Sequence, residues 1–320
     1  MATNSTIKQK AENLPFLFAL LICARVYSKI YSDIKKGGVN AVLDRIYLEI
    51  TNVCNMDCSF CHKTSREKRT MSEQEFDLIL DKIEGKAKHL FFHLMGEPTL
   101  HPLLGKFIEK AYKKGFLPAI TTNGSLLSKR GEELLSCLPY KISISLHAPG
   151  ANPAFSSESY LKSCIDFAKK ASEGGCFVAL RLWNLGSGTD NSNILSYLQR
   201  EFPSEWESRR GGSSQRISNR IFLEWAEEFS WPDPSLPECD INTDLFCYGV
   251  REQIGILVDG TVVPCCLDAE GSIPLGSIFS SGLDNILSSP RAKAMYDGFS
   301  CRRAVESLCR KCGYAKRFSK

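Results

Sequence analysis

The fold of this chain is most constrained by a regular alternation of strand-like and helix-like segments between residues 45 and 201. Short apolar runs alternate with amphipathic stretches, a pattern typical of parallel strands joined by right-handed helical crossovers. The predicted strands are 45–50, 89–95, 117–122, 141–147 and 177–182, with 221–225 as a candidate sixth. The predicted helices are 73–84, 103–114, 128–136, 157–172 and 192–201. Five or six such units favour an α/β fold built as a partial barrel.

The segments on either side of this alternation have a different character. Residues 1–43 are predicted to form an N-terminal helical extension, and the apolar stretch 14–24 within it is well short of the roughly 20 residues that span a bilayer. Its length also matches the core of a signal peptide, which remains the alternative. Residues 203–220 are polar and rich in Ser, Arg and Gly, so we predict a loop there. Residues 239–320 are rich in cysteine and contain a predicted hairpin over 254–263.

The overall composition is that of an ordinary globular protein. The chain has 320 residues, of which 43% are hydrophobic and 24% charged, enough for one large or two smaller domains. The net charge is +4 and no run of like charges suggests nucleic-acid binding. We therefore predict a cytoplasmic protein with reduced thiols, no membrane contact and no direct nucleic-acid partner.

The composition is unusual in its 14 cysteines. A disulfide framework is typical of short secreted chains, so metal ligation or simple burial are the readings to weigh. Cys54, Cys58 and Cys61 form a C-x3-C-x2-C array directly after the first predicted strand. Soft thiolates suit iron–sulfur clusters or zinc, and three of them without a local fourth would leave one metal site open for chemistry. A zinc knuckle or three unrelated core cysteines are the alternatives.

This array, with the aromatic Phe60 before its third cysteine, resembles the signature of the radical S-adenosylmethionine (radical SAM) superfamily. The resemblance covers about residues 44–225 and implies a TIM-like partial (β/α)6 barrel domain over 44–230. It also implies that the three cysteines hold a 4Fe–4S cluster whose open iron is chelated by S-adenosylmethionine. In that family, reduction of the cluster releases a 5′-deoxyadenosyl radical, which takes a hydrogen atom from the substrate. A reductant such as flavodoxin or ferredoxin is then a partner.

Further residues follow the order of the family's motifs. The stretch Met95-Gly96-Glu97-Pro98 resembles the family's G-G-E-P turn with Met in place of the first Gly, and Thr122-Asn123-Gly124 matches its T-N-G turn. The resemblance implies that the first turn meets the methionyl amine, and a fork-shaped guanidinium suits a carboxylate. For Arg181 a surface salt bridge is the alternative. The predicted cofactor-binding residues are Phe60, Gly96, Glu97, Asn123, Ser145, Arg181 and Asn184.

A second cysteine pattern lies near the C-terminus. Cys247, Gly260 and Cys265 form C-x12-G-x4-C, and Cys309 and Cys312 form a distal C-x2-C. This pattern resembles the SPASM/twitch extensions of radical SAM enzymes. The resemblance implies a small α+β domain over 239–320 in which these four cysteines hold one auxiliary 4Fe–4S cluster.

Two points about this second pattern stay open. A structural zinc ion bound by four cysteines would use the same spacing. Cys266 and Cys301 could also replace one of the four predicted ligands, although the register favours Cys265 over Cys266.

The substrate is predicted from polar and aromatic residues near strand ends. A compact barrel with one small lid favours a small molecule, and the general layout resembles the bacterial queuine lyases, which release preQ1 from queuine. That resemblance implies cleavage of a carbon–nitrogen bond, with Glu49 or another inward carboxylate accepting hydrogen bonds from the base. The alternatives are a peptide-modifying radical SAM/SPASM maturase and a non-catalytic metal-binding module. The predicted substrate-pocket residues are Tyr47, Glu49, His93, His147 and Trp183.

Overall fold

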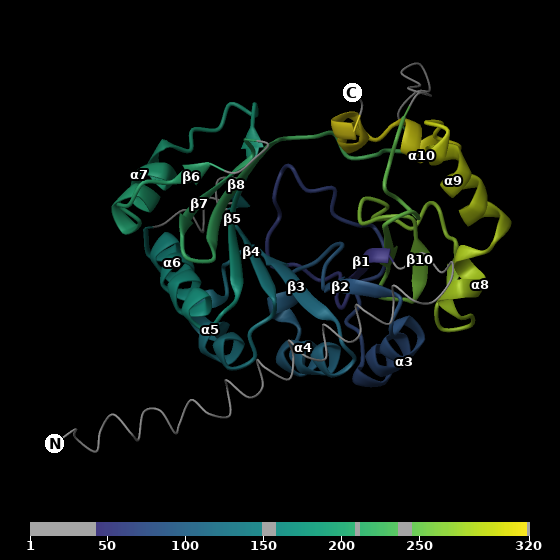
Figure 1. The fold of residues 1–320 in the computed structure, drawn as a ribbon, viewed down its shortest axis with the longest axis horizontal. Coiled ribbons are helices and arrows are strands. Elements are labelled where there is room, and N and C mark those ends of the chain that lie inside the picture. The colour runs from purple at the N-terminus through teal and green to yellow at the C-terminus, as the bar shows by residue number, and fades with distance from the viewer. Residues whose placement is uncertain (1–42, 149–157, 209–211, 236–244, 319–320) are drawn as a thin grey trace. The chain divides into compact units, whose positions relative to one another are not determined.

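Six parallel strands form the centre of the molecule, and Figure 1 shows them with helices on their outer side. The computed structural model describes residues 43–148, 158–208, 212–235 and 245–318. Each strand pairs in parallel with the next, as the alternation predicts. The six are β1 (Leu43–Leu48), β2 (Ala87–Phe91), β3 (Leu117–Thr122), β4 (Lys141–Ser145), β5 (Phe177–Leu185) and β8 (Ile221–Glu227). The partial (β/α)6 barrel is therefore confirmed.

Amphipathic helices cover the outside of this sheet. The helices that connect the parallel strands are α3 (Glu73–Ile83), α4 (Leu104–Lys113), α5 (Leu127–Ser136), α6 (Glu158–Glu173) and α7 (Ser192–Glu201). The first begins with a capping box between Ser72 and Glu75 and buries its apolar side. The rings of Phe76 and Phe107 stack with their centroids 3.8 Å apart, which joins α3 to α4. The inner sides of these helices and the strands form one hydrophobic core.

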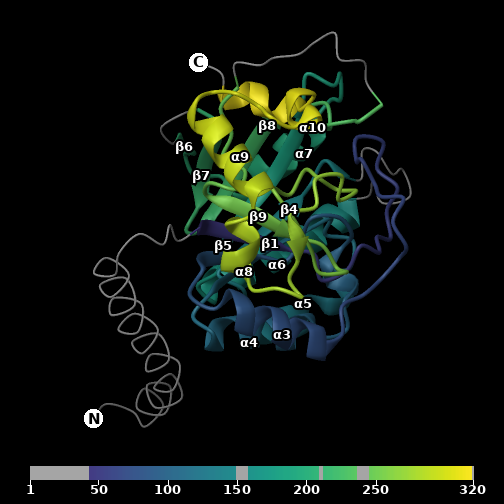
Figure 2. The ribbon, with the colours of Figure 1, turned by 90° about the vertical axis from the view of Figure 1, so that its right-hand side faces the viewer.

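The sheet continues beyond the six parallel strands at both edges. The described strands follow the order β11-β10-β9-β1-β2-β3-β4-β5-β8-β7-β6. At one edge, β9 (Gln253–Ile256) pairs in parallel with β1, and β10 (Thr261–Val263) and β11 (Gly276–Ser277) follow antiparallel. Short helices complete this side: α8 (Leu283–Leu287), α9 (Pro290–Ser300), α10 (Ser307–Arg310) and the 3-10 turn η5 (Gly313–Phe318). Figure 2 shows α8 and α9 in front of β9, on the outer side of the sheet.

Two features differ from the sequence-based expectations. Part of the predicted loop 203–220 forms β6 (Glu207–Ser208) and β7 (Ser214–Ser218), which pair antiparallel to one another and to β8. In β7 only Ile217 is buried, so this edge strand carries no apolar alternation that a sequence could display. In addition, the predicted C-terminal domain is joined to the barrel by main-chain pairing of β9 with β1, and residues 42–320 form one compact unit.

Some predictions fall on residues that the structure does not describe. The N-terminal helical extension predicted over 1–43 lies outside the described residues except for Leu43, which begins β1. Within the described ranges, none of the helices has the length and apolarity needed to cross a lipid bilayer.

Candidate functional site

The loop that carries the C-x3-C-x2-C array leaves the carboxyl end of β1 and is closed at its base. The hydroxyl groups of Thr51 and Thr70 lie 3.0 Å apart, and these residues form an isolated antiparallel bridge. The Asn52 side chain accepts from the backbone N–H of Arg69 at 2.7 Å and donates to the carbonyl of Glu67 at 2.8 Å. Buried side chains thus hold the two ends of the loop together, and the cysteines lie in the part between them.

The turn after β2 packs directly against this loop. Gly96 has a φ of +79°, and a Cβ at this position would lie 2.3 Å from the carbonyl oxygen of Thr51. The backbone N–H of Glu97 donates to the carbonyl of Val53 at 2.8 Å. The predicted G-E-P turn therefore supports the cysteine loop through the backbone, and only glycine fits at the point of contact.

The three cysteines of the loop are accessible to different degrees. Cys54 is exposed, and Cys58 and Cys61 are half-buried. The Asn123 amide nitrogen lies 4.0 Å from the sulfur of Cys54 and donates to the Asn55 side chain at 3.0 Å. Burial, together with the negative charges of Glu97 and Cys61, raises the pKa of the Cys54 thiol. The T-N-G turn after β3 is thus brought next to the cysteine loop, as the predicted grouping requires.

Glu97 is almost completely buried, and its carboxylate is fully hydrogen-bonded within the chain. One oxygen accepts from the backbone and hydroxyl groups of Thr99 at 3.0 and 2.6 Å and from the Thr122 hydroxyl at 2.7 Å. The other accepts from the backbone N–H of Asn123 at 2.7 Å. Burial raises the pKa of Glu97, and these donors oppose the shift. In this structure Glu97 joins the turns after β2 and β3 and does not line the large cavity.

Glu49 was a predicted substrate-pocket residue, but the structure places it inside the protein. Its side chain has no exposed surface, and both oxygens accept from the Arg66 guanidinium at 2.7 and 2.8 Å. Two backbone N–H groups also donate to it, from Met95 at 3.1 Å and from Val258 at 3.2 Å. Glu49 therefore connects β1, the cysteine loop, the turn after β2 and the hairpin of the C-terminal segment.

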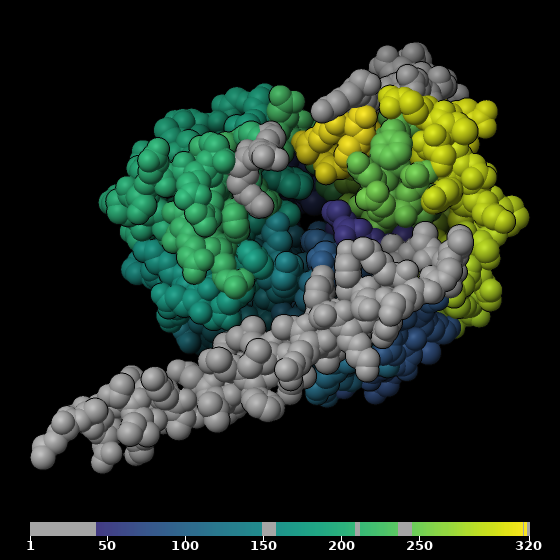
Figure 3. Space-filling view, viewed as in Figure 1, coloured from purple at the N-terminus to yellow at the C-terminus, as the bar shows by residue number. Residues whose placement is uncertain are grey.

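A cavity of about 680 Å³ lies between the barrel and the C-terminal segment. Figure 3 shows this face hollowed between the strands β5–β8 and the C-terminal part of the chain. Aromatic side chains form much of the cavity wall, and Arg45, Lys141, Arg181, Glu228 and Glu252 also line it. The predicted residues that line it are Tyr47, Phe60, His93, Ser145, His147, Arg181 and Trp183. Those that do not are Glu49, Gly96, Glu97, Asn123 and Asn184.

Arg181 and Asn184, both on β5, have different surroundings. The Arg181 guanidinium lies over the Trp183 ring at 4.5 Å, and its Nε is 3.4 Å from a carboxylate oxygen of Glu224. The ion pair between Arg181 and Glu224 therefore lies at the cavity wall and not at the outer surface of the protein. Asn184 is buried, and its side-chain amide exchanges two hydrogen bonds with that of Asn191. Arg181 can therefore meet a ligand in the cavity, whereas Asn184 orders the loop after β5.

Two histidines of the cavity wall are kept neutral. Burial lowers the pKa of His93 to about 3, and the positive charge of Arg181 adds to the effect. Nδ1 of His93 is buried and has no hydrogen-bond partner among the described residues. Burial also lowers the pKa of His147, whose Nδ1 lies 3.1 Å from the carbonyl of Arg181 and whose ring lies 4.9 Å from that of Phe60. Both rings can offer a neutral nitrogen to a ligand.

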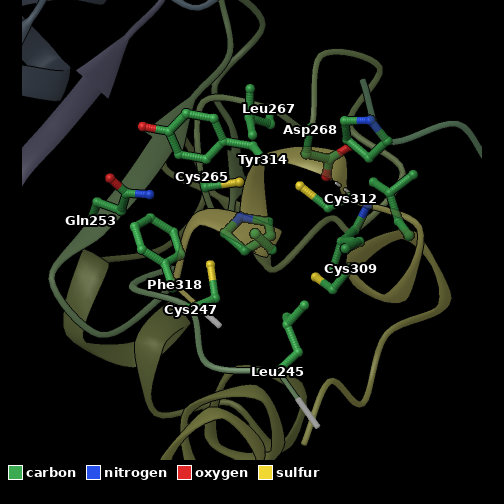
Figure 4. Close-up of a pocket in the computed structure, with 15 residues that line it drawn as sticks. Leu245, Cys247, Gln253, Cys265, Leu267, Asp268, Cys309, Cys312, Tyr314 and Phe318 are labelled. Carbon is green, nitrogen blue, oxygen red and sulfur yellow. Dashed lines mark hydrogen bonds between the residues drawn. The ribbon is translucent and has the colours of Figure 1, made fainter. Parts of the chain in front are cut away.

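The four predicted auxiliary ligands converge. Figure 4 shows the sulfur atoms of Cys247, Cys265, Cys309 and Cys312 pointing into one space, which apolar side chains such as Leu245 enclose. Burial raises the pKa of each thiol, and neighbouring sulfurs add to the effect at Cys265, Cys309 and Cys312. No three His, Cys, Asp or Glu side chains in the described ranges lie close enough together to hold a single metal ion. Four separated thiols around a dry space fit the coordination of a cubane cluster.

The four-thiol pocket borders the large cavity. The same side chains line both spaces: Gln253, Leu267, Tyr314 and Phe318. Trp231 extends this contact to the cysteine loop, since its indole N–H donates to the carbonyl of Phe60 at 3.0 Å. The sequence reasoning missed these residues because single aromatic or aliphatic residues in connecting segments carry no pattern.

The other cysteines among the described residues do not line the four-thiol pocket. Cys266, the alternative ligand, lines the large cavity instead. Cys301 is exposed at the end of α9. Cys164 and Cys176 are buried in the core, where a free thiol packs like a small apolar side chain. Cys23 and Cys239 lie outside the described residues.

Two family models match this chain. Residues 48–175 match the Radical SAM superfamily, and residues 247–313 match the SPASM iron–sulfur cluster-binding domain. The fold and the two cysteine sites thus define the class of enzymes that cleave S-adenosylmethionine with an iron–sulfur cluster. Residues 48–175 are thus a radical SAM domain, and residues 247–313 are a SPASM domain. S-adenosylmethionine, a 4Fe–4S cluster and an auxiliary cluster are therefore its cofactors, as predicted.

The chain is also similar to individual proteins. It is 39% identical over 88 residues to the tungsten-containing aldehyde ferredoxin oxidoreductase cofactor-modifying protein of Pyrococcus furiosus, covering 26% of this chain and 24% of the relative. It is 22% identical over 293 residues to the antilisterial bacteriocin subtilosin biosynthesis protein AlbA of Bacillus subtilis, covering 83% and 64%. These matches span less than two thirds of either relative.

Solved structures share the fold. The structure of native anSMEcpe with bound AdoMet and the Cp18Cys peptide superposes with a TM-score of 0.57 at 14% identity, covering 86% of this chain and 90% of that one.

Proposed function

We propose that Cys54, Cys58 and Cys61 hold the 4Fe–4S cluster that binds S-adenosylmethionine. Three observations support this assignment: the three thiols share one loop, the base of that loop is fixed by Thr51 and Asn52, and the turns after β2 and β3 pack against it. Bound there, the cluster and S-adenosylmethionine supply the removal of a hydrogen atom from a substrate carbon. Three thiolates leave one iron free for the cofactor.

The auxiliary 4Fe–4S cluster is assigned to Cys247, Cys265, Cys309 and Cys312. Their convergence on one enclosed space supports this choice over sets that include Cys266. Since the four-thiol pocket shares its wall with the large cavity, the auxiliary cluster would lie beside a bound substrate.

The cavity residues have distinct roles in this proposal. Arg181 faces the cavity from the middle of β5 and Ser145 from the end of β4, where a guanidinium and a hydroxyl suit the carboxylate and ribose of S-adenosylmethionine. His93 and His147 offer neutral ring nitrogens, and Tyr47 and Trp183 offer aromatic surface for the substrate. A flavodoxin or ferredoxin would supply electrons, and we place the protein in the cytoplasm.

For the substrate, we propose a peptide that this enzyme modifies by hydrogen-atom removal. The main support is the 680 Å³ cavity between the cysteine loop and the SPASM segment. A cavity of this size can accept an amino-acid side chain together with its neighbouring backbone. The names of the relatives support a peptide: one is a bacteriocin biosynthesis protein, and one solved structure holds a peptide.

The queuine-lyase hypothesis has no support from the comparisons. Glu49, the carboxylate named for that reaction, is buried in an ion pair with Arg66 and does not face the cavity. A small-molecule substrate and carbon–nitrogen bond cleavage are therefore the second choice.

The test uses anaerobically reconstituted full-length protein with S-adenosylmethionine and dithionite. We expect 5′-deoxyadenosine to form, and we expect its yield to rise when a synthetic copy of a short peptide encoded beside the gene is added, with a mass change in that peptide. A parallel reaction contains queuine in place of the peptide. Formation of preQ1 with an unchanged peptide would reverse the substrate assignment, and failure to form any 5′-deoxyadenosine would remove the radical SAM chemistry itself.

A further inference from the structure

The adjacent cysteines Cys265 and Cys266 face different spaces. Cys265 lines the four-thiol pocket, whereas Cys266 lines the large cavity. The Cys266 side chain packs against a small cluster that contains Tyr47 and Leu94, both of which also line the cavity. The substrate cavity thus contains a free thiol that the proposed auxiliary cluster does not need.

A second, independent observation marks the same wall as a place where a ligand binds. The ring of His93 lies edge-on to the Tyr47 ring at 5.3 Å, and both residues line the cavity. Nδ1 of His93 is buried without a hydrogen-bond partner among the described residues. Buried polar atoms without a partner are rare, and a catalytic role or a bound molecule is among the reasons for keeping one. His93, Tyr47 and Cys266 therefore form one continuous surface toward the substrate.

We propose that Cys266 is a catalytic residue that donates a hydrogen atom to the substrate. The proposal rests on the proposed function, because it needs a carbon-centred substrate radical in this cavity. Among the groups of this wall, the thiol has the S–H bond that an alkyl radical cleaves readily, since a C–H bond is stronger. The overall reaction would replace one hydrogen atom on carbon by another, as in an inversion of configuration, and would not leave the substrate oxidised.

In this hydrogen transfer the S–H bond of Cys266 breaks, a C–H bond forms on the substrate, and one unpaired electron remains on sulfur. One electron from a reductant of the ferredoxin or flavodoxin class and one proton from water restore the thiol. Tyr47, which belongs to the cluster against which Cys266 packs, positions the thiol in its resting state.

The first test does not depend on turnover. Iron and sulfide are measured in reconstituted wild type, Cys266→Ser and Cys265→Ser, and reactive thiols are mapped with iodoacetamide and mass spectrometry. We expect about eight iron atoms in wild type and in Cys266→Ser, and about four in Cys265→Ser. Cys266 should be alkylated in the wild-type holoenzyme. Protection of Cys266 together with loss of iron in Cys266→Ser would make it a cluster ligand and overturn the proposal.

The second test measures the hydrogen donor without a known substrate. The holoenzyme is incubated in D₂O with S-adenosylmethionine and dithionite alone, and deuterium is measured in the 5′-deoxyadenosine. Thiol hydrogens exchange with solvent and carbon-bound hydrogens do not, so we expect deuterium incorporation in wild type and its loss in Cys266→Ala. The exposed Cys301→Ser is the matched control and should incorporate deuterium like wild type.

The outcomes of this test separate the two proposals. Equal deuterium in wild type and Cys266→Ala, or none in wild type, would overturn the role of Cys266 while 5′-deoxyadenosine formation still supports the proposed function. Absence of 5′-deoxyadenosine in wild type would instead remove the proposed function.

Discussion

Gly96 lies where the turn after β2 meets the base of the cysteine loop. Its φ is +79°, and the carbonyl oxygen of Thr51 occupies the place that a Cβ would need. Non-glycine residues in this left-handed region carry a strain of about 1–2 kcal/mol even without a clash. The contact with a backbone oxygen adds to this, because the backbone cannot rotate away as a flexible side chain would.

Gly96→Ala should therefore displace the cysteine loop. We expect reconstituted protein to hold about four iron atoms per chain in place of about eight, because the four-thiol pocket is not touched. The matched control is Gly85→Ala, which has a φ of +73° with nothing near its missing Cβ and should keep all its iron. Normal iron content in Gly96→Ala would show that the cysteine loop does not depend on close contact with the turn after β2.

His93 gives a prediction on pH. Its pKa is about 3 in the folded protein against a usual value of 6.5. Between these values the unfolded chain binds the additional proton, so this residue lowers the stability of the fold as the pH falls below about 6.5, by up to about 1.4 kcal/mol per pH unit. The Tm of His93→Gln holoenzyme should fall less than that of wild type between pH 7.5 and pH 5. Parallel Tm curves would show that His93 binds protons equally in both states.

Individual site residues were predictable to the extent that a motif fixes them. Phe60, Ser145, His147 and Arg181 line the cavity because parallel strands present their carboxyl ends at one edge of the sheet. Glu49 lies at the same edge of the sheet, but its ion-pair partner Arg66 is 17 residues away in the sequence, within the cysteine loop. No local sequence pattern predicts that these two residues pair. Cys266 was distinguishable from Cys265 by register alone, and its place in the cavity required the structure.

The elements of this fold are linked through the buried Glu49 carboxylate. It joins Arg66 of the cysteine loop, Met95 at the turn after β2 and Val258 of the C-terminal hairpin. Arg66 also donates to the carbonyl of Ala269, so the loop and the C-terminal segment share two contacts through one guanidinium. If either Glu49 or Arg66 loses its charge, the charge of the other remains in an environment with little water.

Glu49→Gln should destabilise the holoenzyme by about 3–5 kcal/mol, since it leaves the Arg66 guanidinium without its counter-charge. The Tm measured under anaerobic conditions tests this. The matched control is Asp284→Asn, which breaks an exposed pair with Lys86 and should cost about 1 kcal/mol or less. Equal changes in Tm for the two variants would contradict a central role for Glu49.

The sequence predicted elements well where apolar periodicity was strong. The six parallel strands and their helices follow directly from it. The strand β7 escaped prediction because only Ile217 of its residues is buried, and an exposed edge strand has no core-facing alternation to reveal it. The pairing of β9 with β1 also escaped, because it joins residues about 200 positions apart and depends on which sheet edge is free.

At the scale of the whole molecule, the two cysteine sites are formed by separate segments of the chain: the loop after β1 and the C-terminal segment that contains β9 and β10. Cys54→Ala should lose about four iron atoms and all 5′-deoxyadenosine formation, while the auxiliary cluster remains. Cys309→Ala should lose about four iron atoms from the other site and leave the first cluster able to bind S-adenosylmethionine, seen as a change in its electron paramagnetic resonance signal when the cofactor is added. Loss of all iron in either variant would show that the two sites fold together.

The pairing of β9 with β1 has a consequence for how the cavity can open. Main-chain hydrogen bonds bind Arg45–Leu48 to Gln253–Ile256, and Arg45, Tyr47 and Gln253 of these two neighbouring strands line the cavity side by side. The part of the cavity wall that the C-terminal segment supplies is therefore continuous with the barrel sheet. It cannot swing away from β1 as a hinged cover would unless these main-chain hydrogen bonds break.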